Sequence, residues 1–107
     1  MEPCSVKYAL SVLQGKWKLY IMYVLSQTGE VRFNQLQREV GGISAVMLSK
    51  NLQELEENGL VTRSEVNDSV PHVEYSLTPL GARLTPALAS LGDWGHEVWV
   101  ANGGPQA

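Results

Sequence analysis

Side chains that could hydrogen-bond to nucleic-acid bases recur at helical spacing between residues 45 and 53. The Gln53 amide could pair with adenine, the Lys50 ammonium with guanine or a phosphate, and the Ser49 hydroxyl with either base. Val46 could contact a thymine methyl group. In a helix that enters a DNA groove, the residues near its amino-terminal end meet the base edges. We therefore predict base contacts from Ala45, Val46, Ser49, Lys50 and Gln53.

The opposite side of this segment is apolar, with Met47 or Leu48, Leu52 and Leu55 at the spacing of a buried helical stripe. Its carboxyl-terminal part is acidic, because three glutamates fall within residues 54–57. Phosphates would repel these carboxylates, so any groove contact must come from the first two turns. The alternative interpretation is a solvated polar helix face in a domain that binds protein instead of DNA.

Two further groups of residues could contact the DNA backbone. Arg32 and Asn34 begin the preceding predicted helix, where backbone amides and the positive end of the helix dipole favour phosphate. Pairing of Arg32 with Glu30 or Glu39 is the alternative. A predicted hairpin follows, and such a wing can reach a minor groove or adjacent phosphates, although Asp68 at its tip argues against deep insertion. The wing candidates are Arg63, Asn67, Ser69 and His72.

Cys4 is the only cysteine, so neither an intrachain disulfide nor a multi-cysteine zinc site can form. It precedes a predicted helix, whose dipole would lower the thiol pKa and favour the reactive thiolate, with Lys7 close by. An ordinary unreactive cysteine is the alternative. His72 and His96 are both distant from Cys4 in sequence, and no paired carboxylates, phosphate loop or metal-spaced histidines occur. We predict no enzyme activity, no cofactor and no metal.

The periodicity predicts the elements that would position these residues. The second helix is apolar nearly all round and should form the buried centre. Gly41-Gly42 separates the third and fourth helices, and Ser44 stands at an N-cap position. Thr78-Pro79 begins the last helix, which Pro86 should kink. The predicted helices cover residues 5–14, 16–26, 32–40, 44–58 and 79–100, and the strands cover 60–66 and 72–77, with a short bridge at Val31.

The last helix has the longest apolar stripe and contains two tryptophans, which are typical interface anchors. One domain of this size cannot bury all of this apolar surface. Packing of the first helix beside the last in a symmetric dimer would cover the remainder. Folding of the last helix over its own domain is the alternative. The predicted interface residues are Val6, Leu10, Leu13, Leu84, Leu88, Leu91, Trp94, Val98 and Trp99.

The charge distribution favours DNA contact by the first half of the chain. The net charge is −3, but residues 1–53 carry six bases and three acids, whereas residues 54–107 carry two bases and eight acids. Few cations are available, so electrostatic affinity should be modest. No signal peptide and no long apolar run occur, so we expect a cytoplasmic protein without membrane contact. Residues 1–100 should form one domain and residues 101–107 a disordered tail.

These segments together resemble the HxlR-type bacterial transcriptional regulators, relatives of the MarR group. The resemblance implies a winged helix-turn-helix homodimer on a pseudo-palindromic operator, with Ser44 also reading bases and Cys4 matching a cysteine that several members use to sense electrophiles or oxidants. Ala45 and Val46 depart from the longer polar residues that members often carry, which predicts lower affinity. The resemblance is carried by Cys4, residues 15–25, 32–44, 47–63 and 71–81, Leu84, Pro86, Leu88 and Trp94-Gly95.

The sequence therefore predicts an α+β, mainly helical fold. It is a winged helix-turn-helix with a two-stranded hairpin wing and amino- and carboxyl-terminal dimerisation helices. The expected function is sequence-specific binding of double-stranded DNA by a homodimer, with a small electrophile or oxidant as a further partner through Cys4. Half-sites should lie about 10 base pairs apart, since two recognition helices must enter successive major grooves on one DNA face. A winged-helix adaptor that binds protein and not DNA is the alternative.

Overall fold

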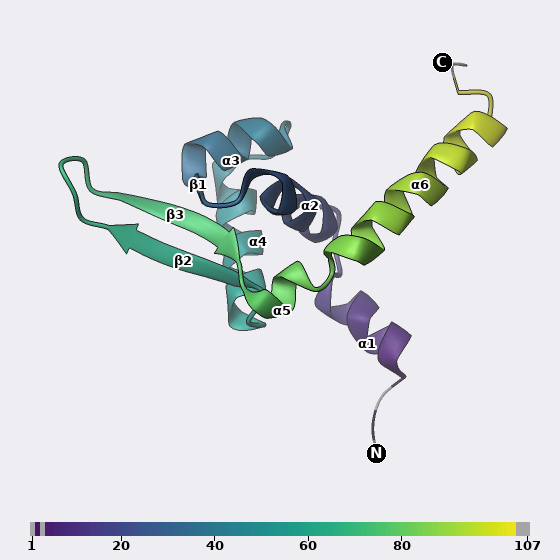
Figure 1. Cartoon of the computed structure of the whole chain (residues 1–107), viewed down its shortest axis with the longest axis horizontal. Coiled ribbons are helices and arrows are strands. Elements are labelled where there is room, and N and C mark those ends of the chain that lie inside the picture. Colours follow the sequence, from purple (N-terminus) through teal and green to yellow (C-terminus); the bar gives the residue numbers. More distant parts are fainter. Residues whose placement is uncertain (1, 3, 105–107) are drawn as a thin grey trace.

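A computed structural model describes residues 2 and 4–104 and has a group of helices with a small antiparallel sheet at one side of it (Figure 1). The predicted order of helix, turn, helix and hairpin is confirmed, so the fold is a winged helix-turn-helix. The helices are α1 (Ser5–Val12), α2 (Lys18–Thr28), α3 (Phe33–Val40), α4 (Ala45–Glu57), α5 (Pro79–Ala82) and α6 (Thr85–Ala101), and the strands are β1 (Val31–Arg32), β2 (Val61–Val66) and β3 (His72–Leu77).

The core forms where α2, α3 and α4 pack together against the sheet. Leu48 is fully buried and Met47 is 39% exposed, so Leu48 belongs to the inner stripe of α4. The prediction that α2 forms the buried centre is confirmed by its four core residues, Ile21, Met22, Val24 and Leu25, although one side of the helix is exposed. Tyr20 and Tyr23 stack on its outer side at 45% and 42% exposure, since a tyrosine can keep its hydroxyl in water while its ring covers apolar surface.

The sheet has the strand order β1-β3-β2 and is antiparallel throughout. Residues 67–71 form the predicted five-residue loop between β2 and β3, and the predicted bridge at Val31 is a two-residue strand that pairs with Tyr75. Val61 and Tyr75 are the buried residues of the hairpin. The rest of the hairpin extends away from the helices as a wing (Figure 1).

The turn between α3 and α4 depends on its glycines. Gly41 and Gly42 have φ angles of +73° and +71°, a region that side chains with a Cβ rarely adopt. The Gln37 side-chain amide donates to the Ile43 carbonyl over 3.0 Å and holds the turn closed. The predicted N-cap is confirmed, since the Ser44 hydroxyl accepts a hydrogen bond from the Met47 amide at 3.1 Å. These contacts fix the angle at which α4 leaves α3.

The expected single carboxyl-terminal helix with a kink is wrong, because two separate helices are present. Thr78 caps α5 through its hydroxyl as predicted, but α5 ends at Ala82. Pro86 has no amide proton to donate to the Ala82 carbonyl, and its ring would clash with that carbonyl in a continuous helix. It instead occupies the first turn of α6, where a proline is tolerated.

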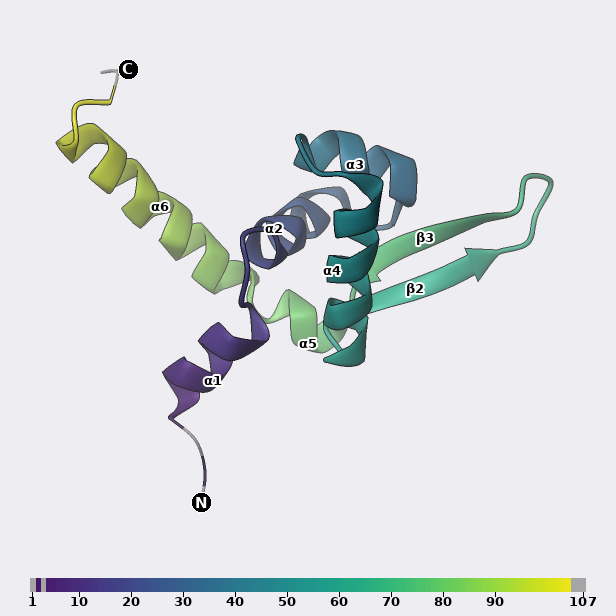
Figure 2. The same ribbon diagram turned by 180° about the vertical axis from the view of Figure 1, so that it is seen from behind.

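The first and last helices extend away from the domain core (Figures 1 and 2). No residue of α1 is buried, and Leu88 is the only buried residue of α6. The helix α6 runs to Ala101, further than the sequence pattern predicted, and residues 102–104 turn back so that the Gly104 amide donates to the Trp99 carbonyl. Residues 105–107, the rest of the tail predicted to be disordered, lie outside the described residues.

At Gly81, the helix α5 lies directly against the backbone of Leu60, the residue before β2. A Cβ at this position would lie 2.2 Å from the Leu60 carbonyl oxygen. We expect Gly81→Ala to lower the free energy of unfolding by about 2 kcal/mol, because the backbone must move apart. Gly92→Ala is the matched control, since a Cβ there meets open space. Urea unfolding measures both, and equal stability of the two variants would contradict this assignment.

Candidate DNA-binding surface

The outer side of α4 carries the predicted base-reading residues. Ala45, Val46, Ser49, Lys50 and Gln53 are all exposed, and Val46 is the most exposed large apolar residue of the domain at 77%. Ser44 is exposed at the cap of the helix. The structure thus brings the predicted set together on one face of α4, between Ala45 and Gln53.

The beginning of α3 lies at the edge of the sheet. Arg32 is the N-cap residue of α3 and pairs with Glu74 in the sheet register, and Asn34 is exposed in the first turn. Among the described residues, Arg32 forms no ion pair with Glu30 or Glu39. Its guanidinium is therefore available to an external anion beside the amino-terminal end of a helix.

The wing contributes a cation directly beside the reading helix. Arg63 on β2 lines a shallow hollow of about 280 Å³ together with Ser49 and Gln53 of α4. Its guanidinium donates to the Glu65 carboxylate at 3.2 Å on an exposed face, a geometry that water screens strongly. Asn67 and Ser69 are exposed in the loop at the wing tip. The hollow therefore brings together three predicted contacts from two elements, Ser49 and Gln53 of α4 and Arg63 of β2.

The fourth wing residue, His72, contacts two residues of the hairpin itself. Its Nδ1 lies 2.7 Å from the Val70 carbonyl oxygen and its Nε2 lies 2.7 Å from a Glu74 carboxylate oxygen. Both partners are acceptors, so the ring must carry two protons to donate to both. The Val70 carbonyl and then the Glu74 carboxylate raise the pKa of His72, and the imidazolium lowers the pKa of Glu74.

This pair predicts a wing whose order depends on pH. Because the pKa of His72 is raised above its ordinary value of 6.5, its contribution is complete below that value and is lost as the pH rises through the raised pKa. We expect amide protection of the strands flanking the wing loop to be complete below pH 6.5 and to fall as the pH rises through the raised pKa of His72, after correction for intrinsic exchange. His72→Gln should abolish this change in a hydrogen-exchange measurement. An identical pH dependence in that variant would show that His72 is not its source.

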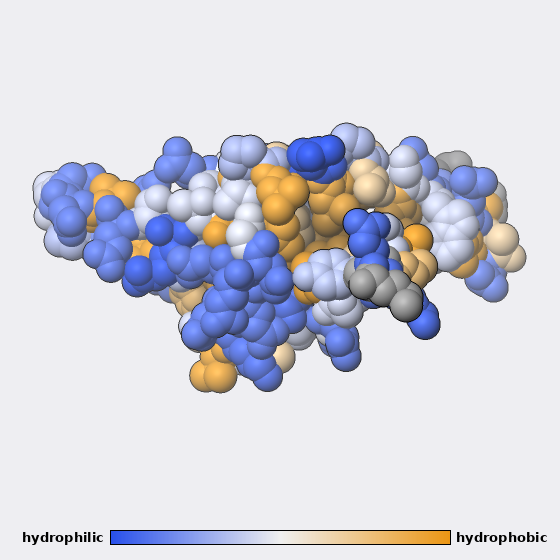
Figure 3. Space-filling view, turned by 90° about the horizontal axis from the view of Figure 1, so that it is seen from below, coloured by the Kyte–Doolittle hydropathy of each residue, from blue (hydrophilic) through white to orange (hydrophobic). Residues whose placement is uncertain are grey.

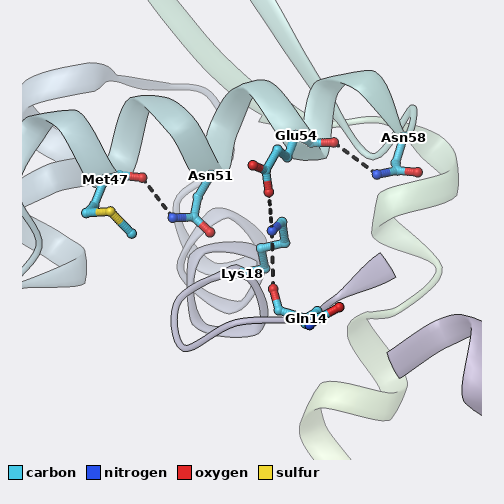
Figure 4. A network of polar contacts seen from close by, with 6 residues as sticks. All are labelled: Gln14, Lys18, Met47, Asn51, Glu54 and Asn58. Atoms are coloured by element: carbon cyan, nitrogen blue, oxygen red, sulfur yellow. Dashed lines mark hydrogen bonds and ion pairs between the residues drawn. The ribbon is translucent and has the colours of Figure 1, made fainter. Parts of the chain in front are cut away.

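Sequence reasoning missed the polar link between α2 and α4 (Figure 4). Lys18, the first residue of α2, is buried, and its ammonium donates to the Glu54 carboxylate at 2.5 Å and to the Gln14 carbonyl at 3.2 Å. The hydrogen bond from Lys18 lowers the pKa of Glu54. A lysine inside an apolar run indicates a buried charge that needs an acidic partner. The partner, Glu54, is 36 residues away in sequence, so helical periodicity does not identify it.

Cys4 occupies the N-cap position of α1 and is exposed as a free thiol. The backbone amides of Lys7 and then Val6 lower its pKa, because they stabilise the thiolate. Among the described residues, no group of three or more His, Cys, Asp or Glu side chains could hold a metal ion. No helix in the described part of the chain is both long and apolar enough to cross a membrane.

The predicted interface residues divide into two groups. Leu88 is buried in the core, and Leu13 and Leu84 pack against it. An apolar groove of about 560 Å³ separates α1 from α5, and apolar side chains gather on that face (Figure 3). The remaining residues are 37–68% exposed, namely Val6, Leu10, Leu91, Trp94, Val98 and Trp99.

A glycine turn between two helices, a polar reading helix and an adjoining hairpin define a winged helix-turn-helix protein. Residues 12–102 match the family described as HxlR-like helix-turn-helix, and the chain belongs to this family of transcriptional regulators. A transcriptional regulator from Halalkalibacterium halodurans is 46% identical over 88 residues, which cover 82% of this chain and 78% of that one.

Three solved structures, of two proteins, are similar over most of their length. A MarR-family transcriptional regulator from Porphyromonas gingivalis superposes with a TM-score of 0.81 at 34% identity, covering 91% of this chain and 94% of that one. The redox regulator HypR in its reduced form superposes with a TM-score of 0.80 at 37% identity, covering 88% of this chain and 92% of that one. Its oxidised form superposes with a TM-score of 0.79 at 38% identity, covering 88% of this chain and 96% of that one. These relatives are regulators, not enzymes.

Proposed function

We propose that this protein regulates transcription as a homodimer that binds double-stranded DNA sequence-specifically at a pseudo-palindromic operator. The observation that carries the proposal is the exposed polar face of α4 between Ala45 and Gln53, which lies beside Arg63 of the wing. Ser49, Lys50 and Gln53 there present the donors and acceptors that major-groove base edges require. Acting on chromosomal DNA, the protein would work in the cytoplasm.

The exposed apolar sides of α1 and α6 support the dimer. Leu10 and Trp94 are 63% and 62% exposed. Within one copy, neither α1 nor α6 packs against enough of the domain to cover such residues. A two-fold axis between paired copies would bury these faces and present two reading helices in the same direction. Half-sites would then lie about 10 base pairs apart, one helical turn along the DNA.

Fluorescence anisotropy tests this function with DNA that flanks the protein's own gene, measured beside scrambled DNA at about 50 and 200 mM salt. We expect binding to the flanking DNA to be tighter and to weaken steeply with salt, since phosphate contacts release counterions. If the flanking DNA is bound no better than scrambled DNA, fragments from the whole genome take its place in the same comparison. Weak, salt-insensitive binding to every DNA would reject the proposal.

A second candidate function is a winged-helix adaptor that binds another protein. The exposed carboxylates of Glu56 and Glu57 at the end of α4 and the net charge of −3 favour it. DNA binding explains more, because Lys16, Lys18 and Lys50 line one hollow beside α4, whereas Glu56 and Glu57 lie at the far end of that helix. An adaptor would show no loss of partner affinity when Lys50 is removed and no dependence on DNA sequence.

We further propose that Cys4 makes DNA binding responsive to oxidants or electrophiles. The thiol is exposed at the first turn of α1, its pKa is lowered, and the chain resembles a protein described as a redox regulator. A disulfide can only join Cys4 to another molecule, because the chain has no second cysteine. Since α1 belongs to the proposed dimer, a disulfide or adduct at Cys4 would change the separation or tilt of the two reading helices.

We expect diamide to release the wild-type protein from DNA and to leave the Cys4→Ser variant bound. The oxidant removes two hydrogens from a pair of thiols and joins their sulfurs, a step that serine cannot take. Anisotropy before and after treatment measures release, and dithiothreitol should restore binding by the wild type. Equal release of both proteins would exclude Cys4 as the switch.

A further inference from the structure

A cationic hollow lies beside the reading helix, on the side away from the wing. Its volume is about 390 Å³, and it is formed by the loop that joins α1 to α2 and by one side of α4. Three lysines and one glutamate line it, which gives a formal charge of +2 in a chain whose net charge is −3. The hollow on the wing side, by contrast, is lined by Arg63 and Glu56 and is formally neutral.

The single acid of this hollow is already neutralised. Lys18 contacts the Glu54 carboxylate at 2.5 Å, deep beside the α1–α2 loop (Figure 4). Among the described residues, neither Lys16 nor Lys50 takes part in an ion pair. The Lys16 ammonium lies 4.8 Å from the centre of the Trp17 ring, which holds it without neutralising its charge. Two cations at the rim are thus free to meet an anion.

The position of the hollow matches one wall of a DNA groove. Lys50 lines the hollow and also belongs to the reading face of α4. A helix in the major groove, about 12 Å wide, has a phosphate backbone on each side. The wing lies on one side of α4 and the α1–α2 loop on the other (Figure 2). The loop with Lys16 therefore stands where the second backbone would pass.

The amino-terminal end of α2 adds to the attraction. Trp17 is its N-cap residue and makes no side-chain hydrogen bond to the first-turn amides. Both Trp17 and Lys18 line the hollow, so the positive end of the helix dipole lies there too. A phosphate would meet a lysine ammonium and a helix terminus together.

We propose that Lys16 and the hollow beside it bind a backbone phosphate of the operator, on the strand opposite the one that the wing approaches. This inference rests on the proposed function, since it assigns a further contact to the same DNA complex. Lys16 is an anchor that sets the position of α4 in the groove and carries no base preference. The acidic chain thereby concentrates its few cations on both sides of one helix.

The test is the salt dependence of DNA binding by Lys16→Gln. With two protomers on the operator, the slope of log K against log salt should fall in magnitude by about 1.8, because each lost phosphate contact removes about 0.9. Affinity near 150 mM salt should drop by roughly 30-fold, and equally on operator and scrambled DNA, if the two salt lines meet near 1 M. Lys16→Arg should keep the wild-type slope.

Lys7→Gln is the matched control, because Lys7 is exposed on α1 and lines neither this hollow nor the reading face. It should leave the slope unchanged. A wild-type slope in Lys16→Gln, with the wild-type protein binding DNA normally, would overturn this inference alone. So would a loss confined to the operator. Absence of salt-sensitive binding by the wild-type protein would overturn the proposed function and this inference together.

Discussion

Replacing Lys50 with glutamate is expected to weaken operator binding on the order of 100-fold or more. Lys50 is exposed in the second turn of α4, where it faces the proposed base edges and the cationic hollow. A good base contact contributes about 1–3 kcal/mol of discrimination, and the dimer makes the contact twice. The new carboxylate would also face phosphate. Anisotropy titration against the operator measures the loss.

Two comparisons isolate this effect from a loss of folding. Lys50 packs on the surface, so the thermal midpoint of Lys50→Glu should equal that of the wild type within about 2 °C. Lys7→Glu makes the same charge change on α1 and should retain nearly all operator affinity. Comparable losses in both variants would mean that net charge alone governs binding, and that α4 does not read the DNA.

Truncation of Trp94 to alanine is expected to raise the dimer dissociation constant on the order of 1000-fold. Trp94 is 62% exposed on α6, beside Leu91 and Val98, and buried tryptophans are the commonest interface anchors. A two-fold interface loses the side chain twice, at about 2 kcal/mol each. Sedimentation equilibrium measures the constant directly.

The matched control is Tyr20→Ala, which removes an exposed aromatic ring from α2 instead of from α1 or α6. It should leave the dimer intact. Trp94→Ala should also weaken operator binding, because a monomer engages one half-site only. A wild-type protein that stays monomeric at micromolar concentration, or a Trp94→Ala variant that dimerises normally, would refute the proposed interface.

The helix-turn-helix was predictable because its signals are local. Gly41-Gly42 can adopt the left-handed conformation, Ser44 can cap α4, and the stripe of Leu48, Leu52 and Leu55 fixes which side of α4 faces out. Once that side is known, the exposed candidates for base contact follow. The hairpin was predictable for the same reason, since alternation and a turn-rich loop mark each strand.

The features that the sequence did not reveal depend on distant contacts. Lys18 meets Glu54 across 36 residues, and the engagement of His72 within the wing requires the observed turn geometry. The apolar pattern of the last segment continued past Pro86, although the missing amide proton ends α5 at Ala82. Lys16 was not a candidate, because only the fold brings it beside Lys50.

The most direct test of the central claim is selection from a random double-stranded DNA library by the purified protein, followed by sequencing of the bound pool. We predict enrichment of a two-fold symmetric sequence with half-site centres about 10 base pairs apart. The Lys50→Glu variant, selected in parallel, should enrich nothing. A wild-type pool indistinguishable from the input library, or from the variant's pool, would contradict sequence-specific DNA binding by this protein.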